Sequence, residues 1–153
     1  MIKRTLQCIL AVSVLLSLNA CAEQAEQIDA PQSNPEAVVV GGQRLTLENH
    51  AQRCALRKPD QSLLTLDMPW PCHLSVDRKD QPRVETFNNA QIIIVQHFAP
   101  EPAPSQECRS QYQAIRHIEG RLEASMVAES GHCLLGAMDQ KHFVAFFTWS
   151  PTS

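Results

Sequence analysis

The stretch Gln91-Ile92-Ile93-Ile94-Val95-Gln96-His97-Phe98 contains four consecutive β-branched apolar residues. Branching at Cβ favours an extended backbone. Side chains alternate between the two faces of a strand, so this run is apolar on both faces and has to be covered on both. It therefore predicts a strand at the centre of a sheet.

The clearest hairpin follows this strand and runs from Gln111 to Ala128 around the turn Glu119-Gly120. Glycine after a polar residue is typical of a two-residue hairpin turn. With such a turn, paired positions sum to 239, and Gln113 lies opposite Met126. The register of the whole hairpin is thereby predicted.

Other short segments have the alternating or apolar pattern of strands. They are 38–40, 43–48, 53–56 (a strand or one turn of helix), 62–68, 72–76, 83–87 and 143–149. Asp139 is placed to cap a helical turn before the last of them. No segment has helical periodicity over three turns. The sequence predicts a mainly β, small antiparallel sheet domain over residues 38–153, meander or barrel-like, with at most one short helix.

The chain starts with Met1-Ile2-Lys3-Arg4, continues through the uncharged segment 9–18, and reaches Leu18-Asn19-Ala20-Cys21. A positive head, an apolar middle and a small residue before the cleavage point form a secretory signal. The last four residues resemble the lipobox of a bacterial lipoprotein precursor. The resemblance implies a signal peptide over residues 1–20, cleavage after Ala20, and acylation of Cys21, which anchors the protein to a membrane.

Ala22 stands where the inner-membrane retention signal has Asp, so the resemblance implies an outer-membrane lipoprotein that faces the periplasm. Residues 22–37 are polar and include Pro31 and Pro35. Such a composition cannot bury apolar surface. We expect residues 21–37 to be the acylated cysteine and a flexible tether.

Four cysteines remain in the predicted domain: Cys54, Cys72, Cys108 and Cys133. An even number in an exported chain favours two disulfides, because the compartment is oxidising. Four cysteines allow three pairings. The hairpin register places Cys108 opposite Gly131, two residues from Cys133, which favours a Cys108–Cys133 bridge and leaves Cys54 to pair with Cys72.

Charge excludes one class of partner. Cleavage after Ala20 takes Lys3 and Arg4 from the 13 basic side chains and none of the 16 acidic ones, which leaves a formal charge of −5. Proteins that bind nucleic acid cluster Lys and Arg. This chain has no such cluster, so we expect no nucleic-acid partner.

The residues give no catalytic or metal motif. The six histidines have neither His-x-His nor His-x3-His spacing, and no serine lies in a Gly-x-Ser-x-Gly turn. Asp139 and Lys141 precede the last predicted strand and fit a helix cap and a surface ion pair. The sequence predicts no catalytic residue, no metal ligand and no cofactor.

Trp70 lies between Pro69 and Pro71. Two prolines make this corner rigid and remove two backbone N–H donors. The indole either faces a partner, as Trp often does at binding hot spots, or folds inward to cap the core beside Cys72. Both interpretations stay open from the sequence, and Trp70 is the candidate partner-binding residue.

A second resemblance rests on short motifs: Pro69-Trp70-Pro71-Cys72, Cys108 with Gln111, and Cys133 followed by Asp139-Gln140-Lys141-His142-Phe143. They are similar to landmarks in a group of small bacterial exported proteins, although Gln140 stands in place of the usual Glu. The group has no established activity, so the resemblance implies a fold and no chemistry.

Location, size, acidic charge and the lack of a catalytic motif favour a non-catalytic module that binds another envelope protein, for example as an inhibitor or immunity factor. One alternative is a small envelope enzyme or metal-handling protein that uses the scattered histidines and acids. Another is a structural or assembly lipoprotein of an envelope complex.

Overall fold

The predicted central strand is β7 (Ala90–Pro100), which pairs along its length with β8 (Cys108–Ile118). The computed structural model describes residues 36–102, 108–131, 133 and 137–149. All of them belong to one compact unit, Ser33–Ser153. Cys21, the signal peptide and the tether up to residue 35 lie outside the described residues. No helix in the described part is long and apolar enough to cross a membrane.

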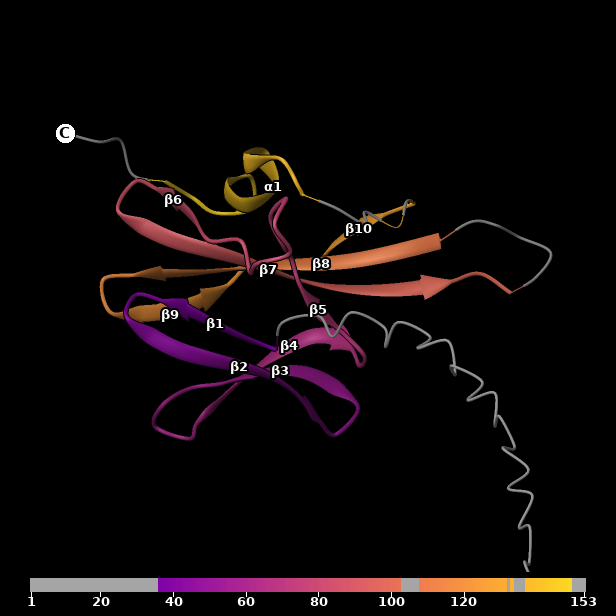
Figure 1. Ribbon diagram of the computed structural model, residues 1–153, viewed down its shortest axis with the longest axis horizontal. Helices are drawn as coiled ribbons and strands as arrows, with labels where there is room; N and C mark the ends of the chain where they lie inside the picture. Colours follow the sequence, from indigo (N-terminus) through magenta and orange to yellow (C-terminus); the bar gives the residue numbers. More distant parts are fainter. Residues whose placement is uncertain (1–35, 103–107, 132, 134–136, 150–153) are drawn as a thin grey trace, which may run out of the picture. The chain divides into compact units, whose positions relative to one another are not determined.

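Two antiparallel sheets form the domain (Figure 1). The four-stranded sheet is a meander in chain order, made of β1 (Ala37–Val40), β2 (Gln43–His50), β3 (Arg53–Arg57) and β4 (Leu63–Pro69). The six-stranded sheet has the order β10–β8–β7–β5, and β6 and β9 also pair with β7 and β8. These shorter strands are β5 (His73–Leu74), β6 (Glu85–Phe87), β9 (Arg121–Ala124) and β10 (Ala128–Ser130).

The six-stranded sheet is buried on both faces, as the β-branched run in β7 predicts. Ile93 and Val95 belong to an apolar core shared with the four-stranded sheet. Ile92 and Ile94 face the other way and belong to a second core, which α1 (Gln140–Val144) covers with Phe143. Three layers result: the four-stranded sheet, the six-stranded sheet and the helix (Figure 1).

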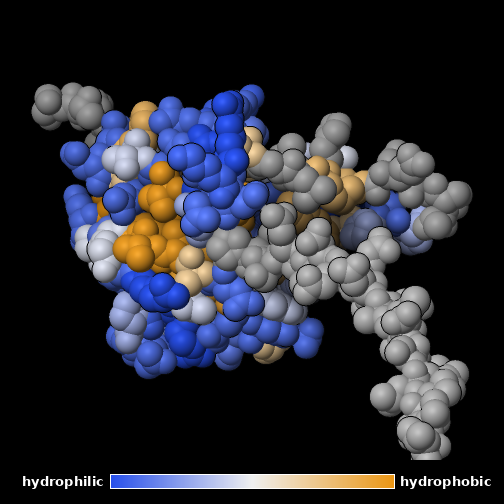
Figure 2. Space-filling model, in the orientation of Figure 1, coloured by the Kyte–Doolittle hydropathy of each residue, from blue (hydrophilic) through white to orange (hydrophobic). Residues whose placement is uncertain are grey.

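Few large apolar side chains of the described residues are exposed to solvent. Figure 2 shows apolar residues at the surface left of centre, on the side where β1 and β9 lie in Figure 1, among mostly hydrophilic neighbours. The exposed large apolar side chains among the described residues are Val39 and Met126.

The prediction of a last strand over 143–149 is wrong. The segment continues α1 to Val144 and then turns, while Phe146, Phe147 and Trp149 pack against the second core. The apolar outer face of the six-stranded sheet needs a cover. A short helix and a turn can place aromatic rings from several directions on that face, whereas another strand would extend the sheet and leave the face open.

The hairpin register is right at first and then shifts. β8 and β9 pair with positions that sum to 239, from Ile118↔Arg121 to Ile115↔Ala124. β10 then pairs with a sum of 240, as in Ala128↔Tyr112. One extra residue between the two ladders makes a bulge, so the prediction of Gln113 opposite Met126 is wrong.

Ser125 explains the bulge. Its N–H donates to the Ala114 carbonyl at 2.8 Å, and its hydroxyl oxygen accepts the Ala114 N–H at 3.0 Å. The hydroxyl thus replaces a backbone acceptor of the ladder, which lets the chain gain a residue without leaving the Ala114 N–H unpaired. Met126, next in the bulge, is 70% exposed.

Both predicted disulfide pairs are confirmed. The Cα atoms are 6.2 Å apart in Cys54–Cys72 and 5.3 Å apart in Cys108–Cys133, within the range that a disulfide spans. The first bridge ties β3 to the segment after β4, beside the core. The second ties the start of β8 to the chain that follows β10.

Candidate functional site

The inner face of the six-stranded sheet changes from apolar to polar along its strands. Under the four-stranded sheet it presents Ile93 and Val95. Two and four residues further along β7 it presents His97 and Ala99. At this level β7 and β8 extend beyond the four-stranded sheet, whose β4 ends at Pro69 (Figure 1). The polar part of the face therefore meets solvent beside the end of β4.

A groove with a cavity volume of about 510 Å³ lies at this place. We call it the strand-end groove. Its lining comes from four strands or their ends: Pro69 at the end of β4, His97 and Ala99 on β7, Arg109, Ser110 and Gln111 on β8, and Glu129, Ser130 and Gly131 on and after β10.

Three of these side chains form one row across three strands. His97 pairs with Gln111 between β7 and β8, and Gln111 pairs with Glu129 between β8 and β10. Neighbouring strands lie about 4.8 Å apart, so the row spans roughly 10 Å. The Gln111 amide donates from Nε2 to Glu129 Oε1 at 3.2 Å. The row is thus a connected set of polar groups.

The corner at 69–71 holds His97 in place. His97 Nδ1 lies 2.7 Å from the Pro71 carbonyl oxygen. A carbonyl oxygen only accepts, so Nδ1 carries the proton and Nε2 of the neutral ring is an acceptor. Pro71 follows Trp70 through a cis peptide bond.

Arg109 is the cationic side chain of the groove. Its Nε lies 2.8 Å from Glu101 Oε1, and its side chain is 82% exposed. Glu129 has its hydrogen bond to Gln111 and, within the described residues, no ion pair with Lys or Arg. Since Glu101 offsets Arg109, the groove keeps the negative charge of Glu129.

Trp70, the predicted partner-binding residue, is half-buried and packs in part against the core that the two sheets share. Its backbone N–H donates to the Gln52 carbonyl at 3.0 Å. The indole therefore packs partly inward, as the capping interpretation expects, and keeps some exposed surface, as the partner-binding interpretation expects. The groove itself uses its neighbours, since Pro69 lines it and the Pro71 carbonyl holds His97.

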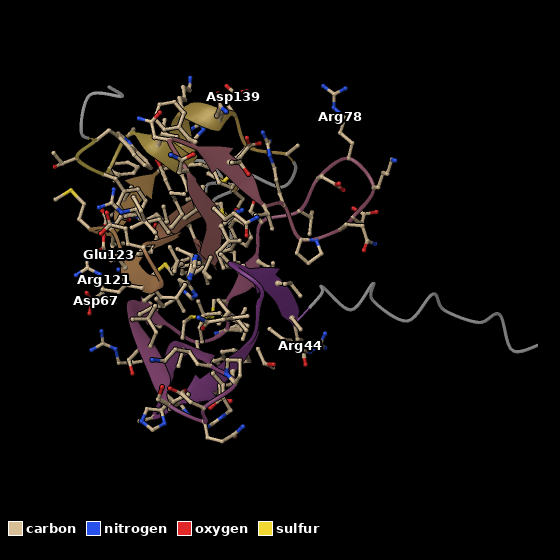
Figure 3. The ribbon with its side chains drawn as sticks, turned by 90° about the vertical axis from the view of Figure 1, so that its left-hand side faces the viewer. Arg44, Asp67, Arg78, Arg121, Glu123 and Asp139 are labelled. Atoms are coloured by element: carbon tan, nitrogen blue, oxygen red, sulfur yellow. A yellow bond between two sulfur atoms is a disulfide. The ribbon has the colours of Figure 1, made fainter. Side chains whose placement is uncertain are left out.

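A second cavity of about 420 Å³ lies between the loop after β5 and the start of α1. Arg78 and Asp139, which Figure 3 labels, are among the residues that line it. Asp77 in this loop accepts the N–H groups of Lys79 and Gln81, which lower the pKa of its carboxyl group. The Asp77 carboxylate therefore binds backbone N–H groups of its own loop.

Two other charged residues of this cavity, Arg83 and Asp139, also have partners. Arg83 bonds Glu85 and the Met138 carbonyl oxygen. The predicted pair of Asp139 and Lys141 is present at 3.6 Å, with both side chains about three-quarters exposed. Exposed pairs of this kind contribute little. Asp139 is the N-cap residue of α1 but makes no side-chain cap hydrogen bond.

The histidines and acids within the described part of the chain form no group of three or more that could hold a metal ion. His73 stacks on Phe98 with ring centroids 6.1 Å apart. Burial, and secondarily the nearby His97, lowers the pKa of His73. By register, the His73 and Phe98 rings lie on the opposite face of β7 from His97, outside the groove.

Sequence reasoning did not select His97, Gln111 and Glu129. A usable signal was present, because the apolar run of β7 changes to Gln96-His97 before the strand ends. Comparison of the chain with protein-family models, curated proteins and solved structures finds no match. Its function therefore has to be argued from the strand-end groove.

Proposed function

We propose that this protein is an outer-membrane lipoprotein, anchored by acylated Cys21 and facing the periplasm, whose domain binds another envelope protein without catalysing a reaction. The strand-end groove is the observation that carries the binding part of the proposal. An inhibitor or immunity factor, which works by occupying a partner, is the form of binding that we favour.

The build of the groove supports a binding role. Its polar row stands on paired strands, and the Cys108–Cys133 bridge closes the same end of the sheet. Sites on strands hold their side chains more rigidly than sites on loops. A few fixed polar groups beside apolar walls are typical of recognition sites. The groove therefore suits a partner that brings its own complementary groups.

The anchor rests on the sequence motif and on chain length. β1 begins at Ala37, and the polar residues between Cys21 and this strand can separate the domain from the bilayer by roughly 20 Å, as a flexible coil of that length does. A groove at the side of such a domain can turn toward proteins in the periplasm.

Cys21→Ser tests the anchor. We expect it to release the protein from membrane fractions, whereas Cys8→Ser, in the segment removed by cleavage, leaves it membrane-bound. Fractionation followed by immunoblotting reads both. A Cys21→Ser protein that stays in the membrane fraction contradicts the lipoprotein proposal.

Ala99→Trp tests the groove. Ala99 is exposed and lines the groove, so an indole there fills it without disturbing the core. We expect the detergent-solubilised full chain to capture an envelope protein stoichiometrically and the variant to lose it. Thr65→Trp is the matched control, because Thr65 is exposed on β4 and is not part of the groove. Equal capture by Ala99→Trp and the unmodified chain contradicts the proposal.

A further inference from the structure

We infer that the strand-end groove receives a lysine side chain of the partner protein. The inference rests on the proposed binding function and specifies the chemistry that the groove recognises. Three observations carry it: the acceptors in the row, the charge balance of the groove and its apolar walls.

The row offers three acceptors. Nε2 of His97 has a lone pair because Nδ1 donates to the Pro71 carbonyl. Gln111 donates from its nitrogen to Glu129, so its carbonyl oxygen is available. Glu129 adds a carboxylate. An ammonium group has three N–H donors and no acceptor, which matches this set.

The charge balance favours a cation. Arg109 is offset by Glu101 at 2.8 Å, and Glu129 is left with a neutral hydrogen-bond partner. The chain as a whole also has a formal net charge of −3. A partner with a basic surface is therefore attracted toward the domain, and a cation in the groove neutralises Glu129.

Lysine fits better than arginine. A guanidinium binds best when both carboxylate oxygens accept in parallel. Oε1 of Glu129 already accepts the Gln111 amide, so the carboxylate does not present a free pair of oxygens. A compact ammonium needs only one carboxylate oxygen together with separate acceptors nearby.

The walls suit a lysine stem. Pro69 and Ala99 give the groove apolar lining beside the polar row. Lysine buries its four methylene groups along such surface while its charged end reaches polar groups. The volume of about 510 Å³ exceeds that of one side chain, which leaves room for the partner backbone.

Titration with a defined peptide tests the inference directly. The probe is the capped tripeptide Gly-Lys-Gly, and the control is the same peptide with norleucine, which has the stem but no amine. We expect the lysine peptide to shift the backbone amide NMR signals of Gln111, Glu129 and Gly131 saturably in the ¹⁵N-labelled, detergent-solubilised full chain. A millimolar Kd is appropriate for one side chain.

Glu129→Gln should weaken this binding at least tenfold, because it removes the charge and keeps the shape. Glu119→Gln is the matched control, since Glu119 is an exposed carboxylate in the turn before β9, away from the groove. Equal shifts with norleucine, no shifts with either peptide, or undiminished binding by Glu129→Gln would each overturn the inference.

Failure here is distinguishable from failure of the proposed function. If the full chain captures a partner and Ala99→Trp loses it while Glu129→Gln keeps it, the groove binds protein but does not select lysine. If the lysine peptide titrates and no envelope protein is captured, the amine site stands and the protein-binding proposal falls.

Discussion

The side-chain amide of Gln113 joins the two sheets. Its Oε1 accepts the Asp67 N–H of β4 at 3.0 Å, and its Nε2 donates to the Ser125 carbonyl in the bulge at 2.6 Å. Among the described strands, β4 is an edge strand that pairs with β3 alone. Gln113 therefore provides a hydrogen-bond partner for the Asp67 N–H at that edge. It also provides one for the Ser125 carbonyl, which the bulge leaves outside the ladder.

Gln113→Leu should lower the free energy of unfolding by about 2 kcal/mol, because it leaves the Asp67 N–H and the Ser125 carbonyl without partners. Urea unfolding followed by circular dichroism measures the loss. Gln111→Leu is the matched control on the same strand and face, since within the described residues its amide bonds the Glu129 side chain and no backbone group. A loss as small as that of the control would show that Gln113 does not hold the sheets together.

The sequence predicted this region in part. Alternation and the turn Glu119-Gly120 were sufficient for the register as far as Ala124. They could not reveal the bulge, because it depends on the hydroxyl of Ser125 bonding across the ladder to Ala114. The predicted register pairs Gln113 with Met126 and therefore does not predict that the Gln113 amide links the two sheets.

Gly41→Ala should destabilise the domain more than Gly42→Ala. Both glycines have positive φ, 57° and 73°, where a Cβ costs about 1 kcal/mol or more. A Cβ on Gly42 meets nothing within 4 Å, whereas a Cβ on Gly41 overlaps the His117 ring. We expect a loss of about 1 kcal/mol for Gly42→Ala and clearly more for Gly41→Ala.

Thermal unfolding of the variants measures this difference, and a double-mutant cycle assigns its cause. In a His117→Ala background the excess loss of Gly41→Ala over Gly42→Ala should disappear. If the excess remains without the imidazole, the close approach of His117 is not its source.

Ser75→Ala should leave stability unchanged or raise it by up to about 1 kcal/mol. Ser75 is 2% exposed, and its hydroxyl has no hydrogen-bond partner within the described part of the chain. Its backbone bonds to Ile94 and Arg83 do not depend on the side chain.

Ser125→Ala is the contrasting substitution, because the Ser125 hydroxyl accepts from Ala114 and donates to the Met126 carbonyl. Urea midpoints should fall for Ser125→Ala and not for Ser75→Ala. A comparable fall in both would mean that the Ser75 hydroxyl is satisfied.

The groove was harder to predict than the fold for a physical reason. A β-branched run marks a buried strand by composition alone. His97, Gln111 and Glu129 become neighbours only through two registers, and the second of these is the shifted one after the bulge. The short helix after Asp139 is confirmed, but the strand predicted over 143–149 is wrong, because aromatic residues favour a strand locally and tertiary packing overrode that preference.

Stability should fall as the pH drops below about 6.5, and His73 should cause part of the fall. Burial, and then the nearby His97, lowers the pKa of His73 below its ordinary value. The folded protein therefore binds this proton less tightly than the unfolded chain does. Stability is complete above the unfolded pKa and declines as the pH falls through it toward the lower, folded pKa.

His73→Gln should reduce the difference between urea midpoints measured at pH 5 and pH 7.5. Carboxyl groups with a lowered pKa, such as Asp77, change the stability mainly below about pH 4. The change in stability between pH 5 and 7.5 therefore comes from histidine. Between pH 7.5 and 8.5 the unmodified chain and the variant should keep a constant difference, because His73 is neutral in both folded and unfolded states. An unchanged pH 5 to 7.5 dependence in His73→Gln would show that this ring does not sense the transition.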